Sequence, residues 1–215
     1  MKIAYKLIDS EMRTCYEFQW ELGKWYETTG EGVLCSPGWF HFYNDPLVGL
    51  FLNPTHANIK NPRLFRTEVE GKFLDDNGLK CGYSRAKLVE ELPVPQISLV
   101  QRIRFAILCT KEVYKGKEWN KWANNWLSGK DRTINATWNN KCNFCTLYTA
   151  SAMENAFYAA KSAAIATKSA ESAATEVYTV QSALESAASV VFAVKSATES
   201  KKIDLIGIAR KAMEE

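Results

Sequence analysis

The chain has 215 residues, of which 47% are hydrophobic, 24% charged and 12% aromatic, and its formal net charge is +3. This composition can bury a core, which excludes a chain that is disordered throughout. No run approaches the roughly 18 consecutive apolar residues of a membrane span, and the first residues lack the apolar core of a signal peptide. We therefore expect a cytoplasmic protein with no membrane partner.

The six cysteines are spread along the chain, except for Cys142 and Cys145. A chain of this length folds without disulfides, so we expect reduced thiols. The spacing of Cys142 and Cys145 is that of half a zinc site, but the sequence offers no second pair of ligands. We favour two small buried residues one helical turn apart, and we expect no metal and no cofactor.

Charge and proline content divide the chain. Residues 1–95 hold 11 Lys and Arg against 13 Asp and Glu, together with all six prolines. Residues 96–141 hold 9 Lys and Arg against 3 acidic residues, and residues 142–215 hold 7 against 8. With a boundary at Pro93 and Pro95, the sequence predicts an α+β protein whose two parts are residues 1–95 and residues 96–215.

The first part is predicted to be a small, mostly antiparallel β domain, because short runs of β-branched and aromatic residues alternate with Gly, Pro, Asn and Asp. The expected strands cover residues 3–8, 14–18, 24–27, 39–43, 65–74 and 80–89. The sequence Asp75-Asp76-Asn77-Gly78 predicts a hairpin turn between the last two. Asn44-Asp45-Pro46 predicts the start of a short helix over residues 47–52.

The second part is predicted to be a helical bundle. Apolar residues recur at helical spacing from Ile97 to Tyr114, and a second helix follows Gly116. Trp119, Trp122 and Trp126 share one face of this second helix, which Ser128-Gly129 ends. A short amphipathic helix over residues 203–213 closes the chain.

Residues 150–200 form an Ala/Ser-rich heptad region. In a frame with position a at Ala156, all thirteen a and d positions from Ala152 to Val194 are apolar, and most are alanine. We favour two or three antiparallel helices packed in the bundle, because one continuous helix would be much longer than a compact body of this size. A single rod that forms an oligomeric coiled coil is the alternative, so a homo-oligomer stays open.

Two groups of residues are candidates for function. The first is a set of speculative ligand-binding residues where a strand gives way to a helix, namely Trp39, His41, Tyr43 and Asp45. The sequence shows no nucleophile elbow, carboxylate pair or phosphate loop beside His41, so we favour a structural histidine. The second is a speculative interaction surface in the basic segment 96–141: Lys115, Lys117, Lys121, Lys130 and Arg132. Nucleic acid is disfavoured there, because three tryptophans on one helical face are typical of a bundle interior.

The run from Cys35 to Pro46, with Glu21-Leu-Gly-Lys-Trp-Tyr-Glu27 before it and Glu68-Val-Glu-Gly71 after it, resembles a family of unknown function found mostly in bacteriophages and bacteria. The family pattern is a Gly-Lys-x-Tyr strand, then Cys-x-x-Gly-Phe-His-Phe, then a helix that begins with Pro. This sequence has one extra aromatic residue, Trp39 before Phe40-His41. The resemblance covers about residues 3–92 and implies no catalytic residues.

The segment from Trp119 to Arg132, with the Ala-rich tail, resembles the helical ends of phage accessory proteins and of immunity proteins. Because the sequence shows no complete catalytic constellation and predicts a long helical surface, our leading hypothesis is a non-catalytic, phage-encoded accessory protein that binds a host or viral protein in the bacterial cytoplasm. One alternative is a nucleotide- or NAD-binding domain centred on His41, by loose analogy with ADP-ribosyltransferase-like folds. Another is a virion component assembled through the Ala-rich helices.

Overall fold

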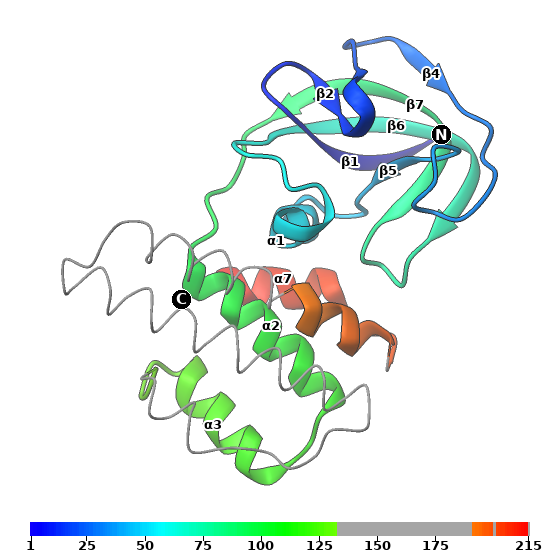
Figure 1. The fold of residues 1–215 in the computed structure, drawn as a ribbon. Helices are drawn as coiled ribbons and strands as arrows, with labels where there is room; N and C mark the ends of the chain where they lie inside the picture. The colour runs from blue at the N-terminus through cyan, green and yellow to red at the C-terminus, as the bar shows by residue number, and fades with distance from the viewer. Residues whose placement is uncertain (133–190, 200, 215) are drawn as a thin grey trace. The chain divides into compact units, whose positions relative to one another are not determined.

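The computed structural model describes residues 1–132, 191–199 and 201–214. The described chain is α+β, with an antiparallel sheet in the first part and helices mostly later (Figure 1). It divides into two compact units, Met1–Gln96 and Ile97–Glu215. The pair Cys142 and Cys145 and nearly all of the heptad region 150–200 lie outside the described residues.

The first unit is built on a sheet with strand order β1-β6-β7-β4, in which β5 also pairs with β7. The strands are β1 (Lys2–Ile8), β4 (Trp25–Glu27), β5 (Phe40–Phe42), β6 (Arg63–Asp75) and β7 (Cys81–Leu92), and every pairing is antiparallel. Strands β6 and β7 are long and curved (Figure 1). One edge of β7 pairs with β6, and its other edge is shared by β5 and β4.

The curvature lets the sheet close on itself. Directly after β5, the N–H of Tyr43 donates to the carbonyl of Tyr5 in β1, and the N–H of Tyr5 donates to the carbonyl of Tyr43, both at 2.8 Å. Strands β1, β6, β7 and β5 therefore form a small barrel-like ring. Its core contains five large side chains that are almost completely buried, namely Trp20, Phe42, Phe65, Ile8 and Leu88.

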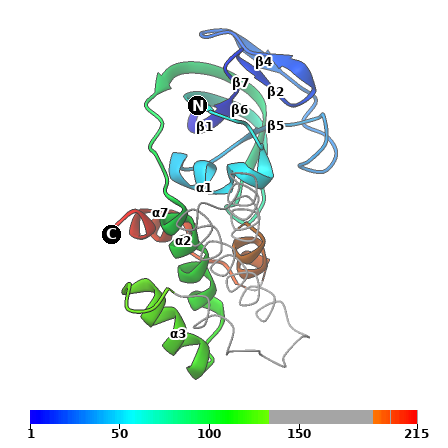
Figure 2. The ribbon, with the colours of Figure 1, turned by 60° about the vertical axis from the view of Figure 1, so that its left-hand side comes forward.

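The turn between β6 and β7 forms as the sequence predicts, and the helix after β5 begins where predicted but extends past residue 52 to His56. Asn77 and Gly78 have φ values of 50° and 79°, the left-handed conformation that a tight hairpin needs. Helix α1 (Pro46–His56) begins at Asp45, whose carboxylate accepts the N–H of Leu47 at 2.8 Å. The helix contacts β1 and lies next to the sheet in the views of Figures 1 and 2.

The strand predicted over residues 14–18 is wrong. The structure has a small hairpin there, with β2 (Arg13–Thr14) and β3 (Phe18–Gln19) joined by the 3-10 turn η1 (Cys15–Glu17). The chain reverses because Tyr16 and Glu17 both adopt left-handed backbone conformations, with φ of 61° and 57°. Neither residue type favours that conformation, so its sequence gives no turn signal.

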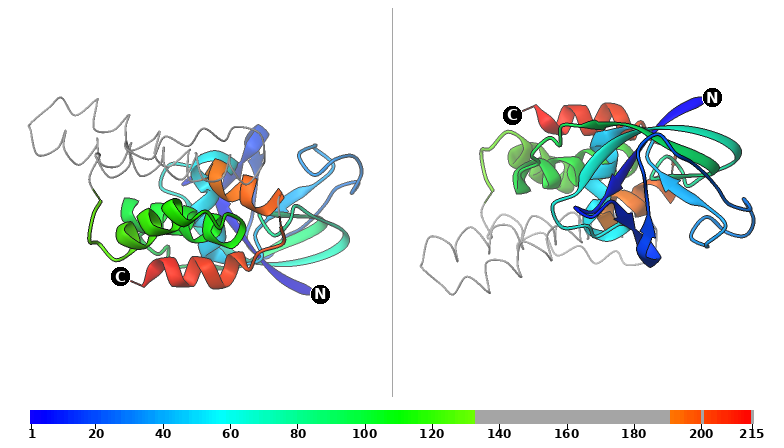
Figure 3. Two further views of the ribbon diagram at one scale, coloured as in Figure 1. Left: turned by 90° about the horizontal axis from the view of Figure 1, so that it is seen from below. Right: turned by 90° about the horizontal axis from the view of Figure 1, so that it is seen from above.

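In the second unit, α2 (Leu99–Val113), α3 (Lys117–Leu127) and α7 (Leu205–Met213) are helical, and so are residues 191–199. Helix α2 contacts α7, and the two lie side by side in Figure 3. The indoles of Trp122 and Trp126 are buried, as the predicted tryptophan face requires. Val191 and Val194, which occupy positions a and d of the heptad frame, are also buried.

Candidate functional site

The four predicted ligand residues lie on or beside β5, and the structure gives their groups structural contacts. The His41 ring nitrogen Nε2 bonds with the carbonyl oxygen of Leu34 in the loop before β5. Burial lowers the pKa of His41, the Leu34 contact opposes this shift, and the positive charges of Lys6 and Lys80 add to it. The ring is therefore held in its neutral form, in contact with the loop.

Trp39, Tyr43 and Asp45 hold neighbouring segments in the same way. The indole N–H of Trp39 donates to the carbonyl of Gly32 at 3.0 Å, and Trp39 is buried. The backbone of Tyr43 closes the ring of strands, and the side chain of Asp45 caps α1. These contacts support the structural interpretation of the group, while its role in ligand binding stays a prediction.

Sequence reasoning missed Lys6, which is buried inside the first unit at 5% exposure. Its Nζ donates to the carbonyl of His41 at 2.8 Å and lies 4.7 Å from the centroid of the Trp20 ring and 4.6 Å from that of Phe42. Two aromatic faces and a carbonyl thus offset part of the cost of burying the ammonium. The alternation of Ala4, Lys6 and Ile8 on one face of β1 was the available signal.

Cys81, at the start of β7, is an inert thiol. It is fully buried, and its Sγ lies 3.6 Å from the carbonyl oxygen of Phe42 and 3.4 Å from Oδ1 of Asn44. Burial raises its pKa to about 12, with a smaller contribution from the negative charge of Asp75. A thiol that stays protonated at neutral pH is a poor nucleophile and a poor metal ligand.

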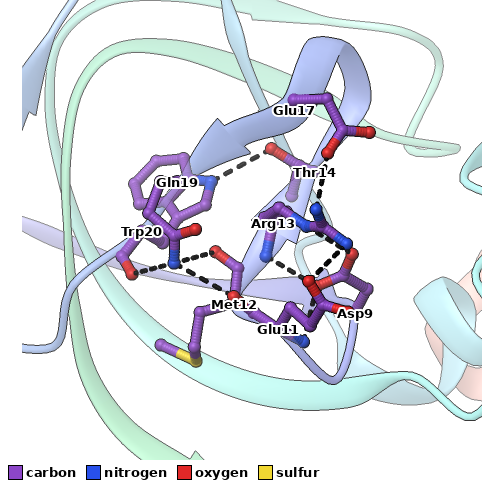
Figure 4. Close-up of polar contacts among 8 residues, drawn as sticks. All are labelled: Asp9, Glu11, Met12, Arg13, Thr14, Glu17, Gln19 and Trp20. Atoms are coloured by element: carbon purple, nitrogen blue, oxygen red, sulfur yellow. Dashed lines mark hydrogen bonds and ion pairs between the residues drawn. The ribbon is translucent and has the colours of Figure 1, made fainter.

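A second cluster, which we call the Tyr16 corner, comprises residues Asp9–Trp20, and Figure 4 shows the polar contacts at its base. At its centre the guanidinium of Arg13 contacts three carboxylates, those of Asp9 at 3.4 Å, Glu11 at 2.7 Å and Glu17 at 2.8 Å. The Asp9 carboxylate also accepts the N–H groups of Arg13 at 2.7 Å and Glu11 at 2.9 Å. These backbone hydrogen bonds, the Arg13 one above all, lower the pKa of Asp9 together with the Arg13 charge.

Further hydrogen bonds tie the Tyr16 corner to the core. The amide nitrogen of Gln19 donates to the carbonyl of Glu11 at 3.0 Å and lies 3.4 Å from the carbonyls of Met12 and Trp20 (Figure 4). The indole N–H of Trp20, which is 1% exposed, donates to the hydroxyl of Thr14 at 3.0 Å. The hairpin therefore has a fixed base.

The tip of that hairpin presents Tyr16 to solvent. Among the large apolar side chains of the described residues, Tyr16 exposes the greatest fraction, 88%. Its backbone and that of Glu17 are left-handed, which costs about 1–2 kcal/mol for each residue that is not glycine. Exposure of a large aromatic ring and backbone strain thus coincide at one turn, a combination typical of functional sites.

The residues of the predicted basic surface lie on or next to α3, and one of them packs back onto that helix. Lys117 and Lys121 are exposed on α3, Lys115 precedes it and contacts the carbonyl of Lys111, and Lys130 is exposed after it. Arg132 turns back onto α3, where its Nε donates to the carbonyl of Trp126 at 3.0 Å and its guanidinium lies 4.8 Å from the Trp126 ring centroid. Since Trp122 and Trp126 are buried, their rings cannot stack on the bases of a nucleic acid.

Among residues 1–132, 191–199 and 201–214, no group of three or more His, Cys, Asp or Glu side chains could hold a metal ion. The same part of the chain contains no helix with the length and apolar character needed to cross a membrane.

Comparison with known proteins gives a family match that covers mainly the first unit. No curated protein matches the chain, and no solved structure does. Residues 2–100 match the model of a domain family described as a domain of unknown function, DUF7666. The match contains both β5 and the Tyr16 corner, so the sheet unit of this chain is similar to a domain family whose function is unknown.

Proposed function

We propose that the chain is a non-catalytic accessory protein that binds a protein partner through the Tyr16 corner. The observation that carries this proposal is the presentation of Tyr16, 88% exposed, on a strained turn with a fixed base. On the resemblance found in the sequence, we further propose that the protein is phage-encoded and acts on a host or viral protein in the bacterial cytoplasm.

A fixed, exposed tyrosine is a favourable contact residue. Tyrosine is enriched among the few residues that contribute most of the binding free energy at protein interfaces. A side chain presented by a rigid turn loses little conformational entropy on binding, since the backbone is already ordered. The free-energy cost of the strained turn is offset by other contacts, among them the ion pair of Arg13 with Glu17 and the hydrogen bond of Gln19 to the Glu11 carbonyl.

The charge of the Tyr16 corner favours a basic partner surface. Asp9, Glu11 and Glu17 share the single guanidinium of Arg13, which leaves an excess of negative charge around the tip. Complementary charge on the partner would speed association and align the two surfaces. We therefore expect lysine or arginine side chains around the pocket that receives Tyr16.

The contacts around β5 support the non-catalytic part of the proposal. His41, Trp39 and Asp45 each use a side-chain polar atom to hold a loop or a helix end. A general base must instead reach the proton of a substrate. We assign His41 and Trp39 to holding the loop before β5 and Asp45 to the start of α1.

The test is affinity purification of tagged protein from lysate of the native bacterial host, followed by titration with the recovered partner. Tyr16→Ala should weaken binding by about tenfold or more, as expected for an interface residue of this kind. Phe192→Ala is the matched control, because Phe192 is also an exposed aromatic residue but belongs to the second unit. Equal binding by wild type and Tyr16→Ala would reject the Tyr16 corner as the contact surface.

A further inference from the structure

Cys35 and Lys80 bring a thiol and an amine into contact outside the Tyr16 corner. Cys35 is exposed and lies in the loop between β4 and β5, whereas Lys80 ends the turn before β7. The Nζ of Lys80 is 2.9 Å from the Sγ of Cys35, although the residues are 45 positions apart. The two atoms thus need little movement to approach bonding distance.

The loop side of this contact is held by the residue before Cys35. The carbonyl of Leu34 contacts the ring of His41, so the backbone next to Cys35 is fixed to β5. The side chain of Leu34 lies over Gly82 in β7, where an added Cβ would be only 2.4 Å from Leu34 Cδ1. The loop therefore packs against β7 two residues from Lys80.

The hairpin side is held by the β6–β7 turn. The carbonyl of Lys80 accepts the N–H of Asp76 at 2.9 Å, and the N–H of Leu79 donates to the carbonyl of Asp76 at 2.8 Å. Leu79 is itself buried, at 1% exposure. The backbones of both partners are thus fixed, and the contact is not a chance meeting of two free side chains.

Cys35 also differs from the other described thiols. Cys81 and Cys109 are buried, and burial raises the pKa of both. Cys35 is open to solvent beside a positively charged group, which is the setting of cysteines that react with oxidants. Among the described thiols, a water-soluble oxidant should therefore reach Cys35 first.

We propose that Cys35 and Lys80 form a reversible sulfur–nitrogen bond when the protein meets hydrogen peroxide. The thiol sulfur first attacks the peroxide, the O–O bond breaks, and Cys35 becomes a sulfenic acid with release of water. Nζ of Lys80, after losing its ammonium proton, then attacks that sulfur and displaces the hydroxyl as a second water. The sulfur gives up two electrons and the peroxide takes them up. A thiol reductant such as dithiothreitol reverses the change.

The bond would tie the loop between β4 and β5 to the β6–β7 hairpin. A cross-link between residues far apart in sequence restricts the unfolded chain, so oxidised protein should unfold at a higher temperature. The loop also supplies the Leu34 carbonyl to His41, which places the link beside the closure of the sheet. This proposal is independent of the protein-binding function, because no residue of the Tyr16 corner takes part.

The experiment is mass spectrometry of the full chain after graded peroxide, with peptide mapping. Wild type should lose two hydrogens without gaining oxygen, regain them with dithiothreitol, resist trypsin after Lys80, and yield one peptide that joins Cys35 to Lys80. Lys80→Met should stop at the sulfenic acid, which dimedone traps. Lys72→Met is the matched control and should behave like wild type, because Lys72 bonds the same loop through the carbonyl of Thr29 rather than through a thiol.

Three results would overturn the proposal. The first is a disulfide from Cys35 to another cysteine, which has the same intact mass but a different peptide map. The second is a wild-type protein that keeps a free or merely oxygenated Cys35 across the peroxide series. The third is the same loss of two hydrogens at Cys35 in Lys80→Met as in wild type.

Discussion

Strand β5 and the Tyr16 corner lie in the same unit and contrast in how they use their residues. The run Cys35–Pro46, which contains β5, is rich in aromatic and polar residues, yet His41 and Trp39 bond the backbone of the preceding loop. The Tyr16 corner has an ordinary sequence, yet it holds Tyr16 at 88% exposure on a left-handed turn. The segment rich in chemically versatile residues therefore lies at the closure of this sheet, whereas the departure from local backbone preference occurs at the surface that we propose binds a partner.

The largest loss of stability is expected from a substitution in β5, where the sheet closes. Phe42 is completely buried, and its ring faces the Lys6 ammonium at 4.6 Å and contacts Tyr83. Phe42→Ala removes packing and leaves the ammonium with one aromatic face fewer, so the free energy of unfolding should fall by about 3–5 kcal/mol. Urea denaturation followed by tryptophan fluorescence measures it. A loss below about 1 kcal/mol would mean that β5 is not part of the core.

A smaller loss is expected where the loop before β5 packs on β7. In Gly82→Ala the new methyl group would meet Leu34 Cδ1 at 2.4 Å, so the loop has to shift. Overpacking of this kind costs about 1–3 kcal/mol. Gly23→Ala is a useful comparison, because that position has φ of 79° but nothing within 4 Å of the added Cβ. If Gly82→Ala unfolded at the same temperature as wild type, the loop would not pack as described.

Local chemistry explains which parts of the fold were predictable from the sequence. Asn77-Gly78 and Asp45-Pro46 act through the backbone of their immediate neighbours, so the hairpin and the start of α1 follow from the residues alone. The closure between Tyr5 and Tyr43 could not be predicted in this way, because the pairing joins distant residues and depends on the curvature of β6 and β7.

The same reasoning separates the two candidate sites. His41 drew attention because histidine is chemically versatile, but its bond to Leu34 depends on how the preceding loop folds. Lys6 was missed because Trp20 and Phe42, which face its ammonium, come from other parts of the chain. Tyr16 was missed because its importance lies in backbone conformation and exposure, and a tyrosine–glutamate pair predicts neither.

The Tyr16 corner should show the opposite trend to β5 on substitution. Tyr16→Asn supplies a residue that accepts a left-handed backbone and leaves the ion pair between Glu17 and Arg13 in place, so the variant should gain about 0.5–1 kcal/mol of stability. It should lose partner binding at the same time, which separates it from variants that fail because they unfold. A Tyr16→Asn variant that is less stable than wild type in urea denaturation would contradict the strain at this turn.

The smallest effect is expected in the pH dependence of stability, and it tests the structural interpretation of His41. Burial depresses the pKa of His41 in the folded protein below its ordinary value of 6.5, so the unfolded chain takes up the proton first as the pH falls. The contribution of His41 to stability is therefore complete above about pH 6.5 and is lost as the pH falls through the lower folded pKa.

His41→Gln keeps a side chain that can donate to the Leu34 carbonyl but cannot titrate, so the stability of this variant should fall less steeply between about pH 7 and pH 5. One proton limits the difference in slope to about 1.4 kcal/mol per pH unit, and urea midpoints for both proteins across this range measure it. Parallel pH profiles would show that the folded protein leaves His41 as free to take up a proton as the unfolded chain does, and its contact with the loop would then not hold the ring neutral.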